Sequence, residues 1–65
     1  MTEQEIKIIM ALARNRLSTA RAANDLNYHR NTIFYHVKKI REKTGLDPLD
    51  FFDMMKLHQE ATRHV

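Results

Sequence analysis

Apolar residues recur every three or four positions along most of the chain, which is the period of a helix with one buried face. The first such run consists of Ile6, Ile9, Met10 and Ala13. Thr2 and Glu5 precede it at the spacing of a capping box, so we expect a first helix over about residues 3–14. The chain has one glycine and one proline, and helices fit its pattern better than strands do. The expected fold class is all-α.

A short, alanine-rich helix is predicted next. Ser18 can cap its first turn, and its inward side would be Ala22, Ala23 and Leu26. Asn27 follows where the chain must turn sharply, and asparagine tolerates the left-handed backbone conformation better than most residues.

A longer basic helix follows this turn. It should start near His29 and end at residues 43–44, where Gly45 is placed to take the left-handed C-cap. Its apolar positions are Ile33, Val37 and Ile40. A short helix, a tight turn and a longer basic helix form the helix-turn-helix pattern, with the turn and the recognition helix at about 27–43. The alternative is a generic helical bundle in which the alanines are only core.

A fourth helix is expected over about residues 48–62, with Asp47 as its N-cap, Pro48 as its first residue and Asp50 in the third helical position. Its large apolar residues spread around more of the helix than one small bundle needs, and they are Phe51, Phe52, Met54, Met55 and Leu57. Packing over the first helix could account for them, but we expect a homodimer interface here. The predicted architecture is one domain over residues 1–65, with a three-helix core plus a C-terminal helix.

The charge is concentrated in the middle of the sequence. The net charge is +3, yet residues 14–43 contain eight Lys or Arg and two acids, and the remaining residues sum to −3. A solvated surface is the ordinary explanation of such a run, although a positive middle between acidic ends also suits a bound polyanion.

Several other classes of function are not expected. There is no cysteine, and histidines 29, 36, 58 and 64 lack metal-ligand spacing, so we expect no metal and no cofactor. A 65-residue chain leaves little room for an active-site cleft or a small-molecule pocket, so we expect no enzyme. No apolar run approaches the ~18 residues of a membrane span. The acidic N-terminus does not resemble a secretory signal, so we expect a cytoplasmic location.

The outward side of the longer helix carries residue types that can read DNA bases. The candidate base contacts are His29, Arg30, Asn31, Thr32 and Tyr35. Arginine can pair with guanine through two hydrogen bonds, asparagine with adenine, and threonine or an aromatic edge can touch the thymine methyl group. The candidate phosphate contacts are Ser18, Thr19, Arg21, Lys38, Lys39 and Arg41. This pattern predicts double-stranded DNA as the partner, with residues 29–43 in the major groove.

The stretch from Ser18 to Ala61 resembles the C-terminal DNA-binding domain of PucR-type regulators, which are bacterial transcription factors of purine and sugar-diacid catabolism. The similarity is carried by His29-Arg30-Asn31-Thr32-Ile33, Tyr35, Ile40, Thr44-Gly45-Leu46-Asp47 and Leu57-His58. More loosely, Ala22-Ala23-x-x-Leu26 is similar to Fis-type domains, and residues 37–45 are similar to LuxR-type domains. The resemblance implies sequence-specific DNA binding by a bacterial transcriptional regulator.

A second interpretation stays open. A domain of helix-turn-helix shape can also serve as a protein-interaction module whose basic face binds an acidic protein partner. Phe34 and His36 favour this alternative, because the PucR-type pattern usually has arginine at both positions. Ala22 also stands where that pattern usually has threonine.

Overall fold

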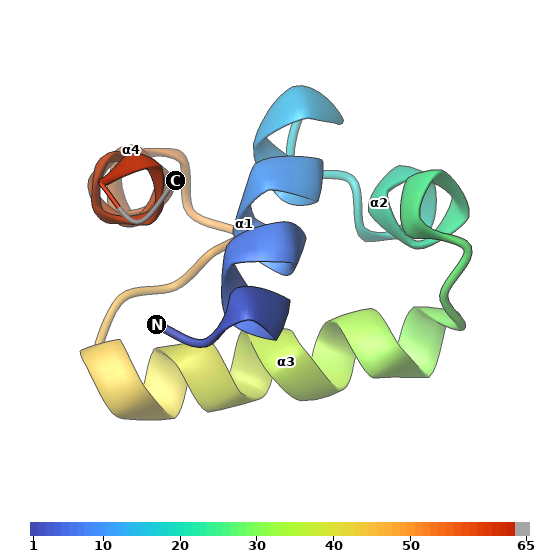
Figure 1. Cartoon of the computed structure of the whole chain (residues 1–65), viewed down its shortest axis with the longest axis horizontal. Helices are drawn as coiled ribbons and strands as arrows, with labels where there is room; N and C mark the ends of the chain where they lie inside the picture. The colour runs from blue at the N-terminus through green and yellow to red at the C-terminus, as the bar shows by residue number, and fades with distance from the viewer. Residues whose placement is uncertain (64–65) are drawn as a thin grey trace.

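A computed structural model of the chain contains four α-helices and no strand in the part that it describes, residues 1–63 (Figure 1). The helices are α1 (Glu3–Arg14), α2 (Thr19–Leu26), α3 (Arg30–Thr44) and α4 (Phe51–Thr62). The all-α prediction is therefore confirmed, and the first three helices have the predicted bounds.

The ends of these helices are fixed by the residues that the sequence singled out. The N–H of Glu5 donates to Thr2 Oγ1 at 3.1 Å, and the N–H of Thr2 donates to Glu5 Oε1 at 2.9 Å, which completes the capping box of α1. Asn27 ends α2 with φ 61°, and Gly45 ends α3 with φ 75°. Both residues thus take the left-handed conformation that turns the chain after a helix.

Helix α4 begins three residues later than predicted, and the expectation that Asp47 would cap it was wrong. The Asp47 carboxylate instead accepts the N–H of Leu49 at 2.9 Å, and the Asp47 carbonyl accepts the N–H of Asp50 at 3.0 Å. These bonds close a turn around the buried Pro48. Asp50 is the N-cap, and its carboxylate accepts the N–H of Asp53 at 3.0 Å.

Helix α1 lies at the centre of the fold and packs against the other three helices. Helices α2 and α4 lie on opposite sides of α1, and α3 runs along one side of the group (Figure 1). Among the helices, α4 contacts only α1, whereas α2 contacts α1 and α3. The larger core side chains are Ile8, Ile9, Leu12, Ile33, Val37, Ile40, Met54 and Leu57, and the small core residues are Ala11, Ala22, Ala23 and Ala61.

The buried stripe of α1 differs from the one predicted. Of the four residues expected to face inward, only Ile9 is fully buried, and Ile6, Met10 and Ala13 are half-buried at the edge of the core. Ile8 is completely buried, because a central helix with neighbours on several sides covers more than one face. The predicted inward residues of α3 are all buried.

Candidate nucleic-acid interface

The candidate base-contacting residues lie at the N-terminal end of α3. His29 is the N-cap, and its Nδ1 accepts the N–H of Asn31 at 3.0 Å. The side chains of Arg30, Asn31 and Tyr35 are exposed, as is that of His29, whereas Thr32 is half-buried. Four of the five predicted side chains therefore lie on one end of α3 and are accessible to a partner.

The exposed face of α3 changes its chemistry toward the C-terminus of the helix. Asn31, Tyr35, Lys38 and Glu42 follow one another at helical spacing, opposite the buried stripe of the helix. Glu42 is exposed and places a negative charge on the last turns of this face. A polyanion therefore finds favourable side chains on the first part of the face and a repulsive one near its end.

The candidate phosphate contacts fall into three groups. Arg21, Lys38 and Lys39 are exposed and have no acidic partner within residues 1–63, although the Lys39 ammonium lies 5.4 Å from the centre of the Tyr35 ring. Ser18 and Thr19 are half-buried at the start of α2, where Ser18 Oγ accepts the N–H of Arg21 at 3.1 Å. Arg41 has its guanidinium 3.7 Å from the Asp47 carboxylate.

Two other cations of the central segment are held by carboxylates from α1 or α2. The Arg14 guanidinium donates to Asp25 at 2.7 Å, and this bond lowers the pKa of Asp25 and raises that of Arg14. The Lys43 ammonium donates to both carboxylate oxygens of the buried Glu5, at 3.1 and 2.9 Å. Counting charges in the sequence therefore overstated the positive surface that a partner can contact.

The pKa of Glu5 reflects its position. Burial by itself raises the pKa, but the hydrogen bond from the N–H of Thr2 and the ammonium of Lys43 together lower it below its ordinary value. Glu5 is thus a buried carboxylate that remains charged and fixes the C-terminal end of α3 to the start of α1.

Tyr28, which the sequence reasoning passed over, fixes the turn between α2 and α3. Its N–H donates to the Ala23 carbonyl at 2.8 Å, and its Oη accepts a hydrogen bond from Gln4 Nε2 at 2.9 Å. The two side chains are 24 positions apart, so no local motif indicates the bond. It positions the start of α3 relative to α1.

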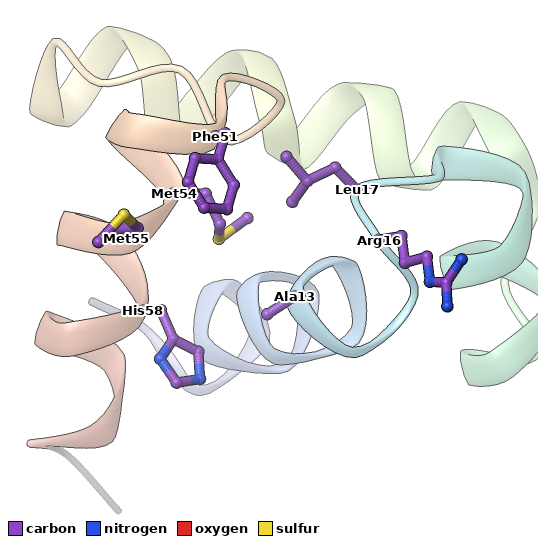
Figure 2. A pocket seen from close by; sticks show the side chains of 7 residues that line it. All are labelled: Ala13, Arg16, Leu17, Phe51, Met54, Met55 and His58. Atoms are coloured by element: carbon purple, nitrogen blue, oxygen red, sulfur yellow. The ribbon is translucent and has the colours of Figure 1, made fainter.

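A second surface feature is an open groove of about 540 Å³ between α4 and the segment that links α1 to α2. Phe51 and Leu17 approach the groove from opposite sides, and the Arg16 side chain points away from α4 (Figure 2). Arg16 and Leu17 have φ values of 57° and 63°, which are uncommon for residues other than glycine. Met54 forms part of the lining.

The structure narrows the predicted dimer surface of α4. Met54 and Leu57 are buried in the core against α1, so these two residues are not available to a partner, contrary to the expectation. Phe51, Phe52 and Met55 remain exposed by 63%, 72% and 56%. The two phenyl rings meet edge to face, with their centres 5.6 Å apart.

A short α2, the turn at residues 27–29 and an exposed α3 define the class of this fold, which is a helix-turn-helix domain. The family model described as the PucR C-terminal helix-turn-helix domain matches residues 6–60, and the chain therefore belongs to that family. The suspected resemblance is confirmed. No curated protein and no solved structure matches the chain.

Residues 1–63 lack two other features. No helix there is long and apolar enough to cross a membrane. No three side chains of the metal-binding types gather in that part of the chain, and His64 lies outside it.

Proposed function

We propose that this chain is the sequence-specific DNA-binding domain of a bacterial transcriptional regulator that acts in the cytoplasm. The observation that carries the proposal is the set of exposed polar and cationic side chains on the first turns of α3, directly after the helix-turn-helix turn. Membership of the PucR C-terminal helix-turn-helix family supports it. The partner is double-stranded DNA.

Helix α3 enters the major groove through its N-terminal half. A helix with side chains is about 10–12 Å across, which fits a major groove about 12 Å wide. Arg30 and Asn31 contact base edges, and His29 and Tyr35 lie beside them at the same end of the helix. This arrangement keeps Glu42, several turns away, from the closest phosphates.

The phosphate contacts come from both helices of the motif. Arg21 on α2 and Lys38 and Lys39 on α3 are exposed cations without acidic partners in the described chain. Ser18 and Thr19 begin α2, and the N–H groups at a helix N-terminus favour a phosphate. Arg41 contributes least, because it must first leave Asp47.

The salt dependence of duplex binding tests this proposal against the protein-interaction alternative. Binding to a random-sequence duplex should weaken as salt rises, with a log–log slope of about −0.9 for each phosphate neutralised. Lys39→Ala should flatten the slope by about one unit, and Lys56→Ala on α4 serves as the matched control. A wild-type slope near zero, together with salt-sensitive binding to an acidic protein, would favour the alternative.

We also propose that the chain forms a homodimer through Phe51, Phe52 and Met55. These exposed side chains lie on α4, which contacts neither α2 nor α3 and is separated from α2 by α1 (Figure 1). The dimer contact therefore uses a different helix from those that carry the proposed DNA contacts. One recognition helix reads few base pairs, whereas a two-fold pair reads half-sites about 34 Å apart. The expected target is a palindromic site.

Sedimentation equilibrium tests the dimer. The wild-type chain and the control variant Lys7→Ala on α1 should form dimers at high micromolar concentration, and Phe52→Ser should shift the equilibrium to monomers. A wild-type chain that stays monomeric, both free and on a selected DNA site, contradicts this part of the proposal and leaves DNA binding in place.

A further inference from the structure

Phe34 is a large apolar side chain on α3 that lies outside the core of the fold. It is 45% exposed, and it belongs neither to the core nor to the apolar residues packed against the core. Ile33 next to it is completely buried, so the burial of α3 does not require an aromatic residue at position 34. The packing of the core therefore does not account for an aromatic side chain at this position.

The position of Phe34 argues for a partner. Residues three or four apart are neighbours on a helix surface, so Phe34 lies next to Arg30, Asn31 and Lys38. All three neighbours are exposed, and all three belong to the proposed DNA contacts. The Phe34 ring is therefore the apolar centre of an otherwise polar and cationic patch.

Tyr35, the next aromatic residue on α3, differs from Phe34 in that its ring has partners within the chain. Tyr35 has the Lys39 ammonium 5.4 Å from its ring centre, and its ring meets the His36 ring edge to face at 5.1 Å. Phe34 has no ring or cation contact with residues 1–63. The exposed part of the ring is therefore available to an external group.

We propose that Phe34 reads the 5-methyl group of a thymine in the major groove, an inference that rests on the DNA-binding function proposed above. A phenyl ring forms no conventional hydrogen bond, and burying it against an unpaired polar base edge is unfavourable. The thymine methyl is the apolar group that the floor of the major groove displays. Phe34 thereby adds specificity at a base pair adjacent to those contacted by Arg30 and Asn31.

The experiment removes only the methyl group. A site is first selected from a random-sequence duplex library, and it should contain a preferred thymine beside the positions sensitive to Arg30→Ala or Asn31→Ala. Replacing that thymine by deoxyuridine should weaken wild-type binding roughly fourfold, the value of one buried methyl or methylene group. Replacing it by 5-methylcytosine, paired with guanine, should retain more affinity than unmodified cytosine.

Variants assign the effect to the ring. In Phe34→Ala the ratio of affinities for thymine and deoxyuridine should fall to about one, and in Phe34→Leu, which keeps an apolar side chain, most of the ratio should remain. Lys7→Ala, at an exposed position on α1 outside both proposed binding surfaces, should leave the ratio unchanged. Circular dichroism verifies that each variant is folded, as expected for exposed positions.

The outcomes separate the two proposals. If the wild-type chain binds no duplex, both the function and the reading of thymine are contradicted. If a site is selected but deoxyuridine binds equally well at every thymine, or if the ratio persists in Phe34→Ala, only the inference about Phe34 is overturned.

Discussion

Both ends of α3 carry basic side chains, but they meet different neighbours. Arg30, at the N-terminal end, has no acidic partner within residues 1–63. At the C-terminal end, Lys43 is bound by the buried Glu5, and Arg41 lies 3.7 Å from Asp47. Within residues 1–63, carboxylates therefore hold the basic side chains at the C-terminal end of α3 and leave Arg30 at the N-terminal end without an acidic partner.

The difference arises from what packs beside each end. The first turn of α1 and the turn before α4 bring carboxylates to the C-terminal end, whereas the tight turn at residues 27–29 brings none to the N-terminal end. The two ends of α3 thus differ in their available positive charge. The cations near its N-terminus are open to a polyanion, and those near its C-terminus are paired with carboxylates. Four predictions test this contrast.

The largest effect is expected at the N-terminal end. Arg30→Ala and Asn31→Ala should each weaken binding to a selected site by about 1–3 kcal/mol and relax the preference at one base position. The melting temperature should barely change, because both side chains are exposed. Fluorescence titration against single-base variants of the site measures the effect. Unchanged discrimination in Arg30→Ala would mean that this end of α3 does not read the bases.

A substitution at the C-terminal end of α3 should change the stability of the fold rather than DNA binding. Lys43→Met removes the cation that pairs with Glu5 and should lower the free energy of unfolding by about 1 kcal/mol. Because Lys43 is committed to the fold, the salt slope of DNA binding should stay the same. Urea denaturation and DNA titration check the two parts. If the salt slope of DNA binding were flatter by one unit in Lys43→Met, Lys43 would be a phosphate contact, and the two ends of α3 would not differ in function.

The same ion pair predicts an acid-sensitive contribution to stability. The pKa of Glu5 is lower in the folded chain than its ordinary value of 4.5, so its stabilising effect is complete above that value. It should disappear as the pH falls from about 4.5 through the lower folded-state pKa. Urea denaturation across this range should show a smaller loss in Glu5→Gln than in wild type. Equal slopes in both proteins would exclude Glu5 as the cause.

The smallest effect is expected from the charge at the far end of the exposed face. Glu42→Gln removes an exposed carboxylate from the face that carries Tyr35 and Lys38. Affinity for all duplexes alike should rise by about 0.5 kcal/mol, and Glu3→Gln on α1 is the matched control. If the gain appeared at one sequence only, Glu42 would be a base contact.

Local patterns predicted the helix ends well, since caps depend on residues two to four positions apart. Thr2 with Glu5, Asn27 and Gly45 all behave as their spacing indicated. The start of α4 was missed, because two aspartates three positions apart can each act as a cap. In the structure Asp50 takes the cap, and the Asp47 N–H donates to Asp53 six residues ahead at 2.9 Å, a bond that the spacing of the aspartates did not indicate.

Contacts between distant residues could not be predicted from spacing. Glu5 and Lys43 are 38 positions apart, and only the packing of α1 on α3 brings them together. On α4, by contrast, the sequence did contain a pattern that indicates which residues are buried. Met54, Leu57 and Ala61 form one stripe at helical intervals, and this stripe is the one that the core buries. The remaining apolar residues could have been separated from it by the same rule.

The cap at the start of α3 also decides what His29 can offer to a ligand. An N–H donates to its Nδ1, so that nitrogen keeps its lone pair and, in the neutral ring, the proton resides on Nε2. The hydrogen bond from the backbone N–H of Asn31, in the first turn of α3, therefore fixes the tautomer of the neutral ring. While the cap holds, His29 presents a donor and no acceptor. It can meet a phosphate oxygen or the N7 and O6 atoms of guanine, and it has no lone pair left for the amino groups of adenine and cytosine.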